Sequence, residues 1–209
     1  MITLCMDTSQ TFLVLALLKE DKVLASVQET CWKRQSEELF PQLIRMMEDN
    51  GVKTEDISEI VITSGPGSYT GVRIAMTVAK VFAAMKEVPL YTLGSLQLIA
   101  GRERHVHVLM DARGHRAYHA VYDSGKAVSE PQAADTDDLR NSIQETETVL
   151  GEGHLIGRED CWPDLAQNFL QLKPEWTAPF LLPRQQAAPP RWQQEPAVLH
   201  LSSPAPLQF

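Results

Sequence analysis

The sequence predicts an α/β fold that contains a duplicated unit, and three observations support this prediction. A β-branched strand, a glycine-rich loop and an apolar helix follow one another over residues 59–84. When the chain is shifted along itself by 104 residues, a strand that ends in Asp7 meets one that ends in Asp111, and the strand, turn and strand that follow also coincide. A repeated supersecondary unit indicates duplication. The length of 209 residues suits two small subdomains with real cores.

We assign residues 1–102 to the first subdomain. Its strands are predicted where short apolar runs are separated by turn-forming residues, and its helices where apolar residues recur at helical spacing. A helix that is capped by Ser36 would end at Asn50-Gly51, with Pro41 as an awkward residue near its start. In chain order the expected elements are strands at 2–6, 12–18 and 23–27, a helix at 36–49, a helical turn at 54–56, a strand at 60–63, a helix from residue 71, a strand at 90–91 and a helix at 95–100.

The helix that starts at Gly71 has a narrow polar arc between two apolar flanks. One flank would pack on the sheet of its own subdomain, and the other would bind a partner. We predict that the small flank meets the partner, together with adaptable methionines of the helix at 36–49. The alternative is that the small flank faces the sheet and the bulky flank, Ile74, Val78, Val81, Phe82 and Met85, faces the partner. The predicted interface residues are Leu43, Met46, Met47, Ala75, Ala79, Phe82 and Ala83.

The second subdomain is expected over residues 103–173 and to be partial. Its first strands repeat the meander at the head of the chain, and a further strand is predicted near residues 148–153. Residues 174–209 contain eight prolines and no lasting apolar period. We expect this Pro/Gln-rich tail to be disordered, or to be read from a shifted frame.

Composition excludes several classes of protein. The formal charge of −8 argues against a free-standing nucleic-acid binder, which would carry a basic face. The three cysteines are scattered and never form a Cys-x-x-Cys pair, which is typical of a reducing compartment. No targeting or membrane-spanning segment is visible, so we expect a cytoplasmic location and no membrane partner.

A phosphate-binding loop is the first candidate site. Glycines at a helix N-terminus expose backbone amides to an anion, but the loop lacks the lysine and the spacing of the known nucleotide fingerprints. A purely structural turn is an equally good interpretation. The residues that resemble a phosphate loop are Asp7, Thr8, Ser9, Gly65, Gly67, Tyr69, Gly71 and Asp111.

Metal and catalytic sites receive less support. His105 and His107 are spaced to project from the same face of a strand and could share a metal ion. Two ligands without a neighbouring carboxylate or cysteine favour a solvated strand edge, so we predict no metal site. No serine, histidine and aspartate constellation can be assembled either, and we predict no catalytic residues.

Several motifs together resemble the bacterial TsaB family, also called YeaZ. They are an Asp-Thr-Ser turn at residues 7–9, the Ser-Glu-x-x-x-Pro helix at 36–41, the string Gly-Pro-Gly-Ser-Tyr-Thr-Gly-Val-Arg at 65–73 and Asp-Ala-Arg at 111–113. The resemblance covers residues 1 to about 125. It implies the duplicated actin-like, sugar-kinase-like (ribonuclease-H-like) fold.

The resemblance also implies a function. Members of this family are non-catalytic partners of a paralogous enzyme, TsaD, in the complex that installs threonylcarbamoyl on the adenosine 3′ of the anticodon in tRNAs that read ANN codons. A TsaE-like ATPase is a further implied partner, and the chain alone would form a homodimer. The tRNA would be bound only through the complex. No cofactor is expected on the chain alone, and ATP would bind at the partner interface.

Two departures from the family pattern bear on this interpretation. Ser95 and Ile99 stand where the catalytic paralogue carries the histidines of its metal pair, and the tail has no trace of the Pro-x-Tyr-Leu-Arg-like ending. The missing histidines favour a scaffold. The alternative is an ATP-binding phosphotransferase or ATPase of the actin-like superfamily that acts alone, which rests on analogy of fold only.

Overall fold

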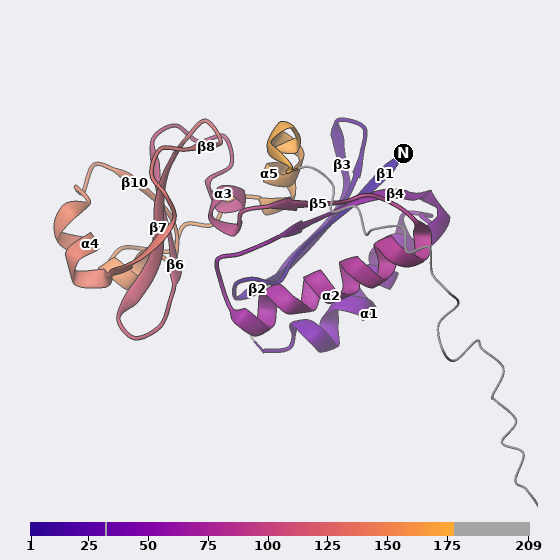
Figure 1. Cartoon of the computed structure of the whole chain (residues 1–209), viewed down its shortest axis with the longest axis horizontal. Coiled ribbons are helices and arrows are strands. Elements are labelled where there is room, and N and C mark those ends of the chain that lie inside the picture. The colour runs from indigo at the N-terminus through magenta and orange to yellow at the C-terminus, as the bar shows by residue number, and fades with distance from the viewer. Residues whose placement is uncertain (32, 178–209) are drawn as a thin grey trace, which may run out of the picture.

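The structure is a computed structural model that describes residues 1–31 and 33–177. Two β-sheets stand side by side, with two short helices packed in the core between them and the longer helices on the outer face of the first sheet (Figure 1). Within this part of the chain, no helix combines the length and apolar character needed to cross a bilayer. The elements are β1 (Ile2–Asp7), β2 (Phe12–Lys19), β3 (Lys22–Thr30), α1 (Gln35–Asp49), η1 (Thr54–Asp56), β4 (Ile57–Thr63), α2 (Tyr69–Lys86), β5 (Leu90–Leu93), α3 (Ser95–Ala100), β6 (Val106–Asp111), β7 (Arg116–Asp123), β8 (Lys126–Ala127), β9 (Gln132–Asp135), α4 (Thr136–Ser142), β10 (Thr148–Gly151), η2 (Gly153–Ile156), α5 (Leu165–Gln171) and η3 (Lys173–Glu175).

The first sheet has the strand order β3-β2-β1-β4-β5. The meander β1-β2-β3 is antiparallel, whereas β4 and β5 join β1 in parallel. Side chains alternate between the two faces of each strand. Leu4 and Met6 of β1 therefore pack with α1 and α2 on one face, and Cys5 packs with α3 and α5 on the other. Both faces are buried in β1, β2 and β4, which explains the almost continuous apolar sequence of these three strands.

The second sheet repeats the first and confirms the predicted duplication. The strands β6 and β7 form an antiparallel pair, and β10 joins β6 in parallel as β4 joins β1. The strands β6 and β7 begin and end 104 residues after β1 and β2. The pairing differs by one residue, because Asp7 lies opposite Val14 whereas Asp111 lies opposite Ala117.

One apolar core joins the two halves of the chain. Helix α3 is buried between the sheets, and α5 returns to cover the first sheet. Gln28 of β3 holds this return, since its side chain donates to the Pro163 carbonyl and accepts from the Leu165 amide, both over 2.9 Å. The boundary between the two subdomains after residue 102 stays a prediction.

The described chain extends beyond residue 174, where the tail was expected to begin. The Thr177 amide donates to the Thr92 carbonyl over 3.0 Å, and Glu175 forms an ion pair with Arg102 at 2.7 Å. These contacts attach the segment to β5 and to the end of α3. The rest of the predicted tail, residues 178–209, lies outside the described residues.

Two helices of the second half were not predicted. Helix α4 is capped by Asp135, whose carboxylate accepts from the amides of Asp137 and Asp138, and α5 is capped by Asp164. Aspartate at the cap stabilises a helix N-terminus. The start of α1 also differs from the prediction. The helix begins at Gln35 without a side-chain cap, and Pro41 lies inside it.

The orientation of α2 contradicts the predicted interface. Its small flank packs on the sheet, because alanine lets the helix backbone approach the strands closely. Of its bulky flank, Val81 and Met85 are exposed, whereas Ile74, Val78 and Phe82 are half-buried against the core. The bulky flank is therefore the one that remains open to a partner, as in the stated alternative. Six of the seven predicted interface residues are buried in the chain's own core and offer no surface to a partner: Leu43, Met46, Met47, Ala75, Ala79 and Ala83.

We expect Ala79→Arg to destabilise the fold itself. The substitution places a long cation against the sheet without a partner, at a cost of about 3–5 kcal/mol, or roughly 10 °C in Tm. Ala84→Arg, on the exposed side of the same helix, should leave Tm within about 2 °C, since exposed substitutions change stability little. Thermal melts by circular dichroism compare the two variants.

If Ala79→Arg does not fold, Ala79→Leu is a milder test, because overpacking the core at this position should cost about 1–3 kcal/mol. Wild-type stability in both Ala79 variants would contradict the orientation of α2.

Candidate functional site

The turn after β1 packs into the glycine-rich loop before α2, and Asp7 lies at the centre of this joint. Its carboxylate is fully buried. One carboxylate oxygen, Oδ1, accepts from the Ser9 amide over 2.9 Å and from the hydroxyl of Thr63, and the other accepts from the Gln10 amide group over 2.8 Å. Three donors of the chain itself therefore satisfy this carboxylate, which is one of the residues that resemble a phosphate loop.

The glycines of the loop are required by the close approach of this turn. A Cβ atom at Gly67 would lie 2.4 Å from the Ser9 carbonyl oxygen, and one at Gly71 would lie 2.0 Å from the Thr8 carbonyl oxygen. The Thr8 hydroxyl donates to the Gly71 carbonyl over 2.6 Å and accepts from the Ala75 amide over 3.1 Å, which links β1 to the first turns of α2. The Ser68 amide donates to the Ser9 carbonyl over 2.8 Å. This geometry favours the structural interpretation of the loop.

The other predicted phosphate residues are placed differently. Gly65 accepts from the Ser95 amide through its carbonyl and so belongs to the joint. Tyr69 is exposed, and its hydroxyl accepts from Arg73 over 2.6 Å. Asp111 is exposed at the end of β6, where its carboxylate accepts from the Arg113 amide over 2.7 Å. Within the described residues no hydrogen bond links Asp111 to Asp7, so the two aspartates of the repeat have separate surroundings.

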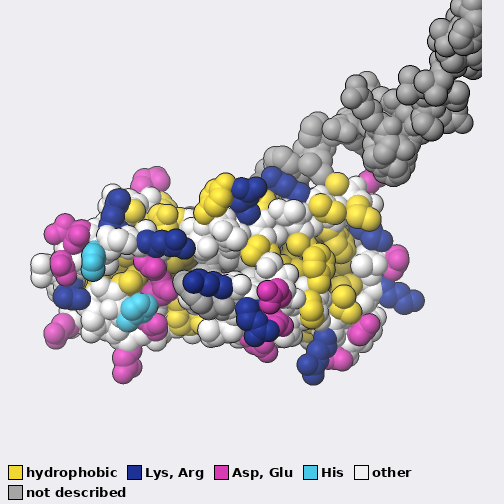
Figure 2. Space-filling view, turned by 90° about the horizontal axis from the view of Figure 1, so that it is seen from below, with side chains coloured by type: hydrophobic (Ala, Val, Ile, Leu, Met, Phe, Trp, Pro, Cys, Tyr) yellow, Lys and Arg dark blue, Asp and Glu magenta, His cyan; other side chains and the backbone are white. Residues whose placement is uncertain are grey.

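An exposed apolar surface covers the outer side of α1 and α2, and we call it the α1/α2 face. Its exposed large side chains include Phe40 and Ile44 at 53% each, Val81 at 55% and Met85 at 77%. Hydrophobic side chains gather over these helices in the view from below (Figure 2). A groove of about 420 Å³ runs between the two helices and is lined by Ser36, Leu39, Phe40, Tyr69, Thr70, Arg73, Ile74, Thr77 and Val78.

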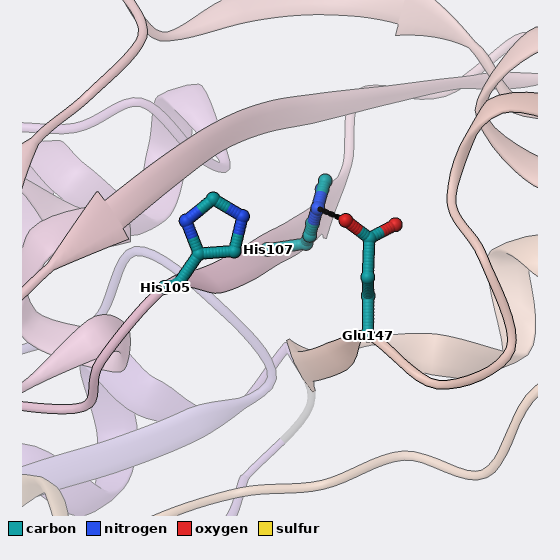
Figure 3. A group of neighbouring side chains, drawn as sticks. All are labelled: His105, His107 and Glu147. Carbon is teal, nitrogen blue, oxygen red and sulfur yellow. Dashed lines mark ion pairs between the residues drawn. The ribbon is translucent and has the colours of Figure 1, made fainter.

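The histidines at the start of β6 have a carboxylate neighbour that the sequence analysis missed. Glu147, in the loop before β10, places its Oε1 atom 3.5 Å from Nε2 of His107 (Figure 3). His105 completes a group whose ligand atoms all lie within 4.8 Å of one another. His107 is buried, so the predicted solvated strand edge is wrong for this residue.

A further histidine stacks on this group from β7. The rings of His107 and His119 lie 5.2 Å apart and nearly parallel, and Nδ1 of His107 is 3.0 Å from Nε2 of His119. Burial lowers the pKa of His107, and burial with the neighbouring His107 lowers the pKa of His119 to about 4. Both shifts favour the neutral form of the ring.

We expect Asp7→Ala to lower the free energy of unfolding by about 3 kcal/mol or more, because three buried donors lose their acceptor. Asp111→Ala removes the exposed aspartate at the matching position of the repeat and should cost less than about 1 kcal/mol. Urea denaturation of both variants measures the difference. Equal stabilities of the two variants would show that Asp7 is not a structural residue.

Comparison with known proteins places the chain in a family. Residues 26–151, more than half of the chain, match the family described as TsaD: tRNA N6-adenosine threonylcarbamoyltransferase. The chain is 36% identical over 126 residues to the tRNA threonylcarbamoyladenosine biosynthesis protein TsaB of Bacillus subtilis (strain 168), a match that covers 58% of this chain and 55% of that protein. It is 26% identical over 183 residues to the protein of the same name in Escherichia coli (strain K12), covering 79% and 75%. The match thus spans about half the length of the Bacillus relative.

A solved structure gives the fold. YeaZ from Pseudomonas aeruginosa superposes with a TM-score of 0.67 at 21% identity, over 82% of this chain and 90% of that chain. This likeness, with the two sheets of matching topology, confirms the predicted fold class. The chain belongs to the threonylcarbamoyltransferase family named above and, within it, to the TsaB (YeaZ) group.

Proposed function

We propose that the chain is a non-catalytic scaffold and activator subunit of the complex that installs threonylcarbamoyl on the adenosine 3′ of the anticodon in tRNAs that read ANN codons. Its relatives carry the name of this biosynthesis, which supports the process. A TsaD-like catalytic paralogue is its partner, and a TsaE-like ATPase joins the complex. The tRNA contacts the complex and not this chain alone, which agrees with the formal charge of −8.

The α1/α2 face is the observation that carries the proposal. Large apolar side chains on an exposed helix pair, beside an apolar groove, mark a protein interaction site. Val81 and Met85 lie four residues apart on α2, and Phe40 and Ile44 lie four apart on α1, so each helix presents one continuous stripe. A partner that offers a similar helix pair would bury both stripes. The same face would join two copies when the chain is alone.

The joint at Asp7 supports a structural role rather than phosphate chemistry. Its carboxylate and the nearby Ser68 amide already bond to the chain, so a nucleotide would have to displace these contacts. This is the reason to prefer a scaffold over an ATPase that acts alone. ATP, where it enters the reaction, belongs at the interface with the partner.

Charged substitutions on the α1/α2 face should abolish docking without unfolding the chain. Ile44→Asp and Val81→Asp place an unpaired carboxylate at the centre of the interface, where losses of about 2–4 kcal/mol are typical, which weakens binding by at least about 30-fold. Calorimetry with the TsaD-like paralogue measures the affinity, and light scattering measures self-association. Val128→Asp is the matched control, because Val128 is also exposed and apolar but lies in the second subdomain. Wild-type affinity in both face variants, or loss of binding in the control, would contradict the proposal.

The purified chain should show no ATP hydrolysis above the uncatalysed background. The buried Asp7 carboxylate is already bonded to donors of the chain, so it is not available to hold a metal ion beside a nucleotide phosphate and an attacking water. Phosphate release is measured with the chain alone and with the paralogue present. The result that contradicts this expectation is an enzyme-like rate for the chain alone that Asp111→Ala leaves unchanged and Asp7→Asn removes.

A further inference from the structure

We propose that His105, His107 and Glu147 form a binding site for a zinc-class divalent transition metal ion. Two imidazole nitrogens and one carboxylate oxygen are the ligands that such ions prefer, and a water molecule would complete a tetrahedral shell. Mg²⁺ and Ca²⁺ prefer shells of oxygen and fit this set poorly. The site lies in the second subdomain and is independent of the α1/α2 face and of the proposed function.

The distances agree with tetrahedral coordination. Zinc binds histidine nitrogen at about 2.0 Å and carboxylate oxygen at about 2.0–2.2 Å, so two ligand atoms of one tetrahedral ion lie about 3.4 Å apart. Nε2 of His107 and Oε1 of Glu147 are separated by 3.5 Å. The ligand atom of His105 lies within 4.8 Å of both. The His105 side chain is exposed, so it has room to move toward the other two ligands.

Each of the two inner ligands is anchored through its other polar atom. Oε2 of Glu147 accepts from the Gln144 amide over 2.7 Å, which leaves Oε1 directed at His107. Nδ1 of His107 lies 3.0 Å from Nε2 of His119, so His107 can donate there while its Nε2 atom binds the ion. Metal-bound histidines usually donate their second ring N–H to such an acceptor, which fixes ring orientation. His119 is therefore a positioning residue.

The loop that carries Glu147 is held in place independently of the ion. Arg158 donates to the carbonyls of Ile143, Gln144 and Glu147 over 2.7–2.9 Å. The positive charge of Arg158 repels a metal ion. The three carbonyl oxygens that accept hydrogen bonds from its guanidinium group partly offset this repulsion. Bound metal would add a bridge between this loop and the start of β6. The expected effect is therefore greater stability of the chain.

The test uses the full chain, stripped of metal by a chelator and titrated with Zn²⁺ and with Co²⁺. We expect one ion per chain and the visible absorption of tetrahedral Co²⁺. Zn²⁺ at about 100 times its Kd should raise Tm by about 5 °C or more. Loss of a residue that hydrogen-bonds to a metal ligand, without touching the metal itself, typically weakens metal binding by about 10–100-fold. His107→Asn and Glu147→Gln should therefore weaken it by at least that factor, and His119→Asn by about tenfold.

His154→Asn is the matched control, because His154 pairs with Asp160 outside the group, and it should bind metal as the wild type does. Three results would overturn the proposal. The first is no binding at micromolar Zn²⁺, and the second is binding that His154→Asn abolishes. The third is binding that His119→Asn abolishes and Glu147→Gln leaves intact, which would place the ion between the two stacked histidines instead. Docking of the paralogue should be the same for His107→Asn as for the wild type, which separates this test from that of the proposed function.

Discussion

The hydrogen bonds of Thr8 determine how the rest of the first subdomain is arranged. Its hydroxyl donates to the Gly71 carbonyl and accepts from the Ala75 amide, so the end of β1 is bonded directly to the first turns of α2. This contact is possible only because Gly67 and Gly71 have no side chain at the points where the turn approaches. With the helix held this close, only alanines fit between it and the sheet. The bulky flank must then face outward, and the α1/α2 face follows from that.

Local chemistry made much of the first subdomain predictable. The meander, the buried strand before the loop and the helix at residues 95–100 follow from short-range patterns of apolar and turn residues, and the structure confirms them. The repeat predicted the pairing of β6 with β7. The orientation of α2 was not predictable from helical periodicity, which shows that two flanks exist but not which one meets the sheet. Close backbone approach at Gly71 decides that question, and it is a tertiary contact.

The remaining differences also arise from contacts between distant parts of the chain. Glu147 is forty residues from His107 in sequence, and β10 brings it there by pairing Thr148 with Val106. The parallel pairing of β10 with β6 matches that of β4 with β1, but β10 does not lie 104 residues after β4, so the repeat in the sequence did not reveal this neighbour. Helices α4 and α5 were missed because they are short and are defined more by their aspartate caps than by an apolar period.

In the proposed complex, α1 and α2 form the docking surface of a scaffold subunit. Hydrogen–deuterium exchange of the chain, alone and with the TsaD-like paralogue, tests it without altering any residue. Binding should slow exchange in peptides that cover Gln35–Asp49 and Tyr69–Lys86 and leave β6 and β7 unchanged. Protection confined to the second subdomain, with α1 and α2 exchanging as in the free chain, would contradict it.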